Sequence, residues 1–185
     1  MRKFIRPIVA ALYIACLAIA NCVISADSAT AQEQAPSPIV RQIALTKKQI
    51  EGVISAQKEM DEINEQVSEK PKPYLIVAEQ FENAAKKNGF ASYDEYTNVV
   101  ENISIVLAGL DPTTKKYIGS EALIKEQIAQ VQANKQMPPE DKTVTLDELN
   151  AALKSPAPRV ENKGNIDLVA AYYDKLAEAM GNDQQ

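Results

Sequence analysis

The hydrophobic residues of this chain form one continuous apolar run followed by a series of helical stripes. The run extends from Ile8 to Ala20, and the stripes lie between residues 46 and 180. Within each stripe, apolar residues recur every three or four positions, which is the spacing of one face of an α-helix. The sequence contains no strand-length alternation of apolar and polar residues bounded by hairpin turns. It therefore predicts an all-α fold of five or six short amphipathic helices.

The first stripe begins at Thr46-Lys-Lys-Gln49, which has the form of a capping box, and ends before Pro71-Lys-Pro73. Gln57 and Asn64 interrupt its apolar positions. Because a thin stripe offers little area to bury, we expect this helix to lie at the periphery of the fold.

Two capping signals meet between the second and third helices. Asn88-Gly89-Phe90 ends a helix that begins at Tyr74, since glycine readily adopts the left-handed conformation of a helix C-cap. Ser92-Tyr-Asp-Glu95 is a second capping box and starts a helix that runs to about Ala108. This third helix becomes apolar nearly all round between Ile103 and Leu110, so we expect it to be central.

Prolines and glycines mark the boundaries of the remaining helices. Ser120 is expected to cap the fourth helix, which ends at Met137-Pro138-Pro139. The fifth helix has two candidate starts, Pro139 or the capping-box pattern Thr145-Leu-Asp-Glu148. After a linker rich in helix breakers, an unbroken stripe predicts a single sixth helix over 165–181.

The N-terminal run has the three parts of a cleavable secretory signal peptide. Basic residues open it, the apolar run follows, and Ala29-Thr30-Ala31 fits an A-x-A cleavage site, so cleavage is expected after Ala31. The alternative is an uncleaved anchor, because the run extended through Ile24 approaches the roughly 20 residues that span a bilayer. The mature protein is expected in the periplasm or outside the cell.

We expect four consecutive segments along the chain. Residues 1–31 form the signal peptide, 32–42 a disordered polar lead-in, 43–181 a single compact helical domain and 182–185 a polar tail. Residues 32–185 carry 17 Lys and Arg against 24 Asp and Glu, a net charge of −7. An acidic surface repels phosphate groups, so neither nucleic acid nor, after cleavage, a membrane is an expected partner.

Residues 32–185 lack several of the residue types on which enzyme chemistry commonly depends. The chain has no His, and both cysteines, Cys16 and Cys22, lie within residues 1–31. Ser-His and Cys-His nucleophiles and Cys- or His-bound zinc are therefore excluded. The sequence also lacks a calcium-binding loop and a glycine-rich phosphate loop, so we expect no catalytic residue, no metal site and no cofactor.

Paired carboxylates leave one enzymatic alternative open, a hydrolase that acts on cell-wall polymer. Such an enzyme needs two acids across a cleft, one of them with a raised pKa. The acids here are instead expected in first turns of helices or on the polar side of the first helix, where the helix dipole and solvation account for them. They are Glu59, Asp61, Glu62, Glu65, Asp94, Glu95, Glu140, Asp141, Asp147 and Glu148.

Tyr172 is the residue that the sequence marks as a candidate partner contact. It lies beside the apolar stripe of the last predicted helix, and a half-exposed tyrosine combines apolar area with a polar group. Together with the missing catalytic residues, this predicts a non-enzymatic helical protein that binds another protein or an apolar ligand.

Leu45-Thr46-Lys47-Lys48-Gln49 resembles the LTxxQ motif of the Spy and CpxP family of small helical periplasmic proteins. That family is associated with envelope stress and chaperone activity, so the resemblance implies such a role. The chain has one copy of the motif and is acidic, whereas those chaperones resemble basic cradles. Residues 86–111 are also similar to small uncharacterised exported helical proteins of Gram-negative bacteria. Neither resemblance assigns a functional residue.

Overall fold

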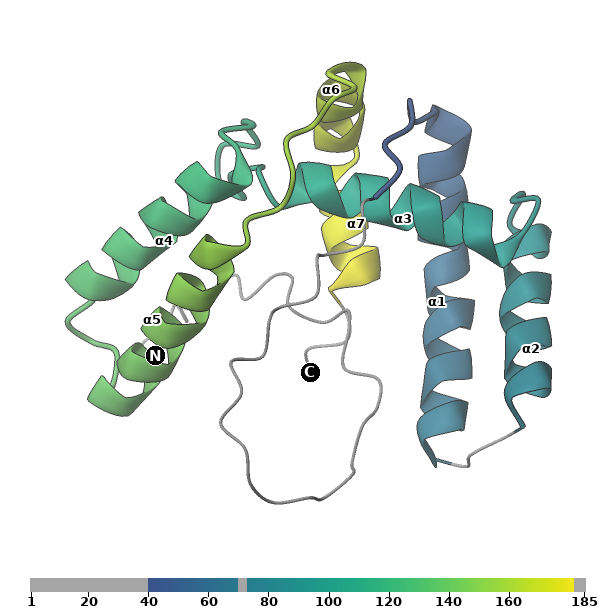
Figure 1. Ribbon diagram of the computed structural model, residues 1–185, viewed down its shortest axis with the longest axis horizontal. Coiled ribbons are helices and arrows are strands. Elements are labelled where there is room, and N and C mark those ends of the chain that lie inside the picture. The colour runs from purple at the N-terminus through teal and green to yellow at the C-terminus, as the bar shows by residue number, and fades with distance from the viewer. Residues whose placement is uncertain (1–39, 70–72, 182–185) are drawn as a thin grey trace, which may run out of the picture.

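The computed structural model describes residues 40–69 and 73–181 (Figure 1). The predicted signal peptide, its cleavage site, residues 32–39 of the lead-in and the tail at 182–185 lie outside these residues. Within them the fold is all-α, as predicted, but it has seven helices rather than five or six. These are α1 (Lys47–Glu69), α2 (Tyr74–Lys87), α3 (Tyr93–Leu107), α4 (Ser120–Ala133), α5 (Pro139–Lys154), α6 (Gly164–Ala171) and α7 (Tyr173–Met180).

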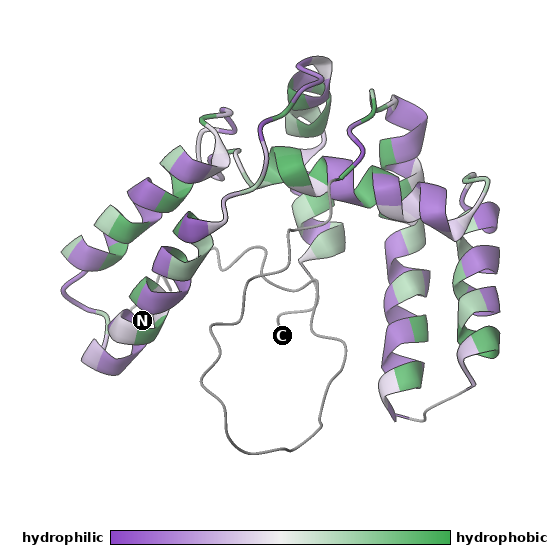
Figure 2. Ribbon diagram, viewed as in Figure 1, coloured by the Kyte–Doolittle hydropathy of each residue, from purple (hydrophilic) through white to green (hydrophobic). Residues whose placement is uncertain are grey.

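Helix α3 is central, as its apolar stripe predicts. It runs across the molecule, and α1, α2 and α6 pack against it (Figure 1). Val99, Ile103 and Val106 of α3 are fully buried, and Ile105 is buried although it points the other way along the helix. Figure 2 shows a hydrophobic last turn at the C-terminal end of α3, which agrees with burial on more than one side there.

The expectation that the first helix is peripheral is wrong. Helix α1 packs against α2, α3 and α7, and its Ile50 and Val53 have no exposed surface. The stripe is completed by small residues, Gly52 and Ala56, which let neighbouring backbone come close. A Cβ atom on Gly52 would lie 2.9 Å from the Asn88 carbonyl oxygen and 3.1 Å from the Phe90 ring. The buried face of α1 was not predicted because part of it consists of small residues rather than large apolar ones.

The first predicted capping box forms, and the second forms with its return bond to the residue before the cap. The Thr46 hydroxyl accepts a hydrogen bond from the Gln49 backbone N–H at 3.3 Å, and the Gln49 side chain accepts from the Thr46 N–H at 3.0 Å. Ser92 accepts from the Glu95 N–H at 3.1 Å, and Glu95 reaches back to the N–H of Ala91 at 2.7 Å. These bonds satisfy N–H groups that a helix start otherwise leaves without partners.

The predicted glycine cap ends α2. Gly89 has φ +92°, and the N–H of Phe90 donates to the carbonyl oxygen of Ala85 at 3.1 Å, the six-residue bond of a Schellman motif. Phe90 is buried just beyond it. The turn therefore fixes the angle between α2 and α3.

Ser120 does not cap α4, contrary to prediction. It is the first residue of α4, and its hydroxyl donates to the carbonyl oxygen of Ala157 at 2.9 Å. Gly119, with φ +90°, takes the cap position without a side-chain bond. The serine therefore ties the start of α4 to the linker that follows α5.

Helices α4 and α5 form a hairpin that projects from the rest of the molecule (Figure 1). Of its two candidate starts, α5 uses Pro139, and Thr145 lies inside the helix with its hydroxyl bonded to the Asp141 carbonyl oxygen. No residue of α5 is buried. The apolar stripe of this helix is therefore only half covered by α4.

The predicted sixth helix is divided at Tyr172. Its N–H donates to the Val169 carbonyl oxygen at 3.0 Å, a shorter turn than the α-helix makes, and its ψ of 7° separates α6 from α7. Val169 and Leu176, on either side of the break, are both fully buried. Because the stripe continues across the break, hydrophobic periodicity could not detect it.

Two buried asparagines hold an N-terminal strap, residues 40–46, against the helices. Asn102 donates to the Arg41 carbonyl oxygen at 3.0 Å and accepts from the Ile43 N–H at 2.9 Å. Asn165 donates to the Ile43 carbonyl oxygen and accepts from the Leu45 N–H, both at 2.8 Å. Residues 40–42 were expected in a disordered lead-in, but these bonds attach the strap to α3 and α6.

Candidate functional site

Three consecutive large apolar side chains are exposed in the first turn of α2. Tyr74, Leu75 and Ile76 have exposed fractions of 83%, 79% and 49%. We call these three residues the apolar tip, because they lie at the end of the α1/α2 hairpin that is farthest from α3 (Figure 1). Single exposed apolar residues are common, whereas large contiguous apolar patches are typical of interaction surfaces.

Burial along α2 increases from its N-terminal first turn toward its C-terminus. Ala84 and Ala85, near the C-terminus of α2, are fully buried, and their small side chains permit close packing. At the N-terminus, Pro73 supplies no side-chain cap, and its carbonyl oxygen accepts the first bonds of the helix. The first turn of α2 therefore carries large apolar residues without covering them.

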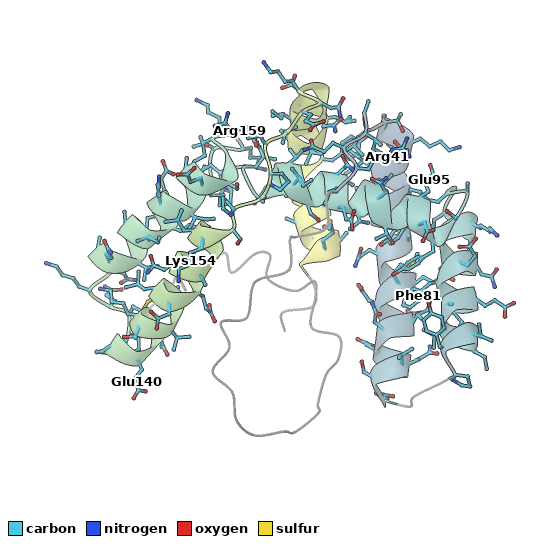
Figure 3. The ribbon with its side chains drawn as sticks, in the orientation of Figure 1. Arg41, Phe81, Glu95, Glu140, Lys154 and Arg159 are labelled. Atoms are coloured by element: carbon cyan, nitrogen blue, oxygen red, sulfur yellow. The ribbon has the colours of Figure 1, made fainter. Side chains whose placement is uncertain are left out.

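Aromatic contacts join α2 to α3, and an ion pair joins α2 to α1. Phe81 of α2 points into the space between α1 and α2 (Figure 3), and its ring stacks on Tyr93 with centroids 4.9 Å apart. Tyr93 in turn stacks on Tyr96 at 5.9 Å. Lys87 of α2 pairs with Glu59 of α1 at 3.0 Å. The tip therefore lies on a helix that packs against α1 and α3, rather than on a loop.

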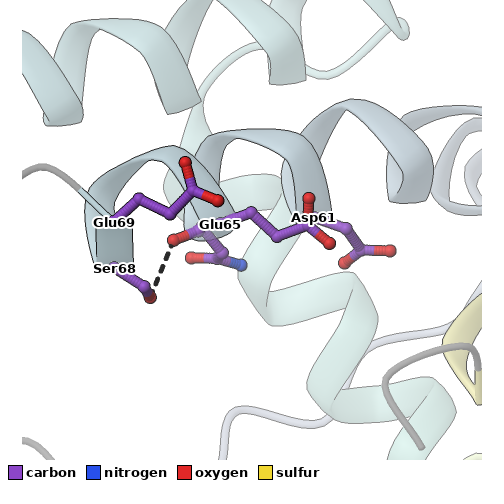
Figure 4. Close-up of a pocket in the computed structure, with 5 residues that line it drawn as sticks. Asp61, Glu65, Ser68 and Glu69 are labelled. Atoms are coloured by element: carbon purple, nitrogen blue, oxygen red, sulfur yellow. Dashed lines mark hydrogen bonds between the residues drawn. The ribbon is translucent and has the colours of Figure 1, made fainter. Parts of the chain in front are cut away.

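Acidic side chains line the α1 side of the same hairpin. Asp61, Glu65 and Glu69 lie one turn apart along α1 and, with Asn64 and Ser68, line a shallow hollow (Figure 4). The Ser68 hydroxyl donates to the Asn64 carbonyl oxygen at 3.0 Å. A second hollow lies between α1 and α2. Its lining is mostly polar and comprises Glu59, Glu62, Ile63, Gln66, Gln80 and Asn83.

Three carboxyl groups have clearly lowered pKa values. A hydrogen bond from the Tyr93 N–H, followed by one from Lys86, lowers the pKa of Glu82. Hydrogen bonds from Thr114 lower the pKa of Asp111, and Lys125 lowers the pKa of Glu121. These groups are held ionised in turns and surface pairs, which is the reverse of what a general acid requires.

The acid pairs predicted from the sequence are distributed over separate elements. Asp94 and Glu95 lie in the first turn of α3, and Glu140 and Asp141 in the first turn of α5, as expected. Asp147 and Glu148 lie in the middle of α5 and are exposed, because α5 begins at Pro139 rather than near Thr145. Within the described residues, no group of three Cys, His, Asp or Glu could hold a metal ion.

Tyr172 lies half-buried at the junction of α6 and α7. Its hydroxyl donates to Glu51 of α1 at 2.9 Å, and the Lys175 ammonium lies 5.7 Å from its ring centroid. Partial burial, with the neighbouring Glu51 carboxylate, raises the pKa of Tyr172. Its ring is accessible enough to touch a partner, and that role stays a prediction.

The apolar tip was not predicted from the sequence. Tyr74, Leu75 and Ile76 were included in a helix without being separated from its buried face. The available signal was the run of five apolar residues after Pro73, from Tyr74 to Ala78, because adjacent residues cannot all share one face of a helix. At least part of such a run has to be exposed at the end of a hairpin.

Comparison of the chain with protein-family models, with curated proteins and with solved structures finds no match. None of the helices in residues 40–69 and 73–181 combines the length and the apolar character needed to cross a membrane. The LTxxQ residues have a local role in this fold, since Thr46 and Gln49 cap α1 and Leu45 is buried in the core.

Proposed function

We propose that this chain is an exported, non-enzymatic helical protein that binds another protein through the apolar tip. The observation that carries the proposal is the exposure of Tyr74, Leu75 and Ile76 in one turn of a helix that packs against α1 and α3. Leaving these side chains in water forgoes the free energy that their burial would supply. A protein partner that covers the tip recovers it.

A protein partner fits these surfaces better than a small apolar ligand. Ligand sites are concave and lined mainly by apolar side chains. The hollows along α1 are lined mainly by acids, amides and a serine, whereas the apolar tip is at the end of a hairpin. We therefore place the binding function on the tip rather than in a pocket.

A binding role also accounts for the acids better than the carboxylate-dependent hydrolase does. The acids of the α1 hollow all come from one helix, so they do not face each other across a cleft. The carboxyl groups with shifted pKa values are shifted downward. Binding of unfolded clients, the role that the LTxxQ resemblance implies, is one form of this proposal.

Affinity capture with matched variants tests the proposal. The tagged wild-type protein, a Leu75→Ser/Ile76→Ser variant and a Val144→Ser variant are used to capture proteins from periplasmic extract. Val144 is also an exposed apolar residue, at 57%, but lies on α5. We expect the tip variant to lose a partner that wild type and Val144→Ser both retain. Identical captured proteins for all three would contradict the proposal.

A further inference from the structure

We infer that the partner docks on the apolar tip through a basic amphipathic segment, with Lys or Arg side chains on the border of an apolar face. This inference rests on the proposed function and specifies the partner's chemistry. It joins two features of one hairpin, the apolar first turn of α2 and the acidic last turns of α1.

The last turns of α1, which lead to the tip, carry mostly negative charge. Residues 58–69 of α1 contain five carboxylates and a single lysine, Lys58. Lys70 and Lys72 follow in the sequence, and residues 58–79 as a whole still hold six acids against three lysines. A partner with Lys or Arg beside its apolar face would therefore be attracted to this border, and an acidic partner would be repelled.

Among the acids of α1, Asp61 accepts a hydrogen bond from the Gln57 side chain and Glu62 pairs with Lys58. Glu59 is paired with Lys87, but no ion pair to Glu65 or Glu69 occurs within residues 40–69 and 73–181. Asp61, Glu65 and Glu69 are spaced at i and i+4, where like charges destabilise a helix. Cationic side chains of a partner would relieve this repulsion at the same time as the tip is covered.

A second copy of this chain fits the surface poorly. Residues 32–185 carry a net charge of −7, and two tips brought together would also bring together the acidic last turns of two α1 helices. The same repulsion applies to anionic lipid. The charge therefore selects a basic protein segment as the occupant.

Designed peptides test the inference on the purified exported protein. Three labelled amphipathic helices share a leucine face and differ only in carrying Lys, Gln or Glu elsewhere. We expect the Leu/Lys peptide to bind about tenfold more tightly than the Leu/Glu peptide in fluorescence anisotropy, with an affinity that falls as salt rises. Equal binding of all three peptides would overturn the inference but leave the apolar tip as a binding site.

Variants locate the binding on the hairpin. Glu65→Gln/Glu69→Gln should weaken Leu/Lys binding about threefold and reduce its salt dependence. The matched control Glu140→Gln/Asp141→Asn removes two charges from α5 and should change neither. Leu75→Ser/Ile76→Ser should abolish binding of both the Leu/Lys and the Leu/Gln peptide, with circular dichroism confirming that each variant is folded. Equal weakening by the α5 control would overturn the inference as nonspecific charge attraction.

Discussion

Asn102 and Asn165 each use both ends of a side-chain amide to satisfy the backbone of the N-terminal strap. Both side chains are almost completely buried, with exposed fractions of 2% and 3%. Between them they bond the carbonyl oxygen of Arg41, both backbone groups of Ile43 and the N–H of Leu45. Asn102 also belongs to a glycosylation sequon with Ser104, and its burial leaves the amide no room for a glycan.

Asn165→Ala should destabilise the fold by about 2 kcal/mol, because it leaves the Ile43 carbonyl and the Leu45 N–H without partners in a buried site. Urea unfolding measures this change. The control Asn150→Ala, on the exposed side of α5, should change stability by less than about 0.5 kcal/mol. Trypsin should also cut after Arg41 faster in Asn165→Ala. Equal stabilities of the two variants would contradict the role of Asn165 in holding the strap.

Gly52 should tolerate no side chain, since a Cβ atom there would press on the Asn88 carbonyl oxygen and the Phe90 ring. We expect Gly52→Ala to lower the free energy of unfolding by about 1–3 kcal/mol. The matched control is Gly164→Ala at the start of α6, where a Cβ atom meets nothing within 4 Å. That change should be neutral or stabilising by up to about 1 kcal/mol. An unchanged free energy of unfolding for Gly52→Ala would contradict the close packing of α1 on the turn that follows α2.

At the scale of elements, the helix caps and stripes that depend on local residues were predicted correctly. Thr46 and Ser92 cap their helices, Gly89 ends α2, and the stripe of α3 is buried. The errors arose for features that depend on contacts between residues far apart in the sequence. Gly52 and Ala56 bury α1 through close approach, and the break at Tyr172 leaves the apolar stripe intact.

The candidate site could be predicted less well than the fold. Tyr172 was named from its place beside a stripe, and its bond to Glu51 of α1 could not be foreseen. The start of α2 at Tyr74 was predicted, but which of its faces the neighbouring helices cover depends on how the helices pack together. A surface is a property of the assembled helices, whereas caps and stripes are properties of single segments.

The connection between α2 and α3 should be sensitive to acid. The pKa of Glu82 is lowered from 4.5 by the Tyr93 N–H, so ionised Glu82 contributes stability above this value. That contribution is lost as the pH falls through the lowered pKa of the folded state. Wild type should therefore be more stable than Glu82→Gln at pH 7, and the difference should shrink at about pH 3. Urea midpoints at both pH values provide the measurement, and a constant difference would contradict this account.

At the scale of the whole molecule, burial is divided unequally. The core joins α1, α2, α3, α6 and α7, whereas the α4/α5 hairpin packs mainly on itself and α5 has no buried residue. Local opening requires less free energy where few apolar contacts are broken. We therefore expect amide hydrogens of α5 to exchange faster than those of α3 in native-state hydrogen exchange. Equal protection of α5 and α3 would contradict this division.

Export is also a claim about the whole molecule. N-terminal sequencing of protein recovered from the periplasm should begin at Gln32, the residue after Ala29-Thr30-Ala31. Cleavage there would leave the strap, which begins at Val40, attached to the mature chain. Recovery of a chain that begins at residue 1 would contradict cleavage and favour the uncleaved anchor.

The central claim is that the apolar tip is the surface on which another protein docks. Site-specific photo-crosslinking in the cell tests it most directly, with a photoreactive residue at Leu75 or, as the matched exposed apolar control, at Val144. We expect a discrete adduct of higher mass from position 75 that position 144 does not give. Absence of an adduct at 75, or the same adducts from both positions, would contradict it.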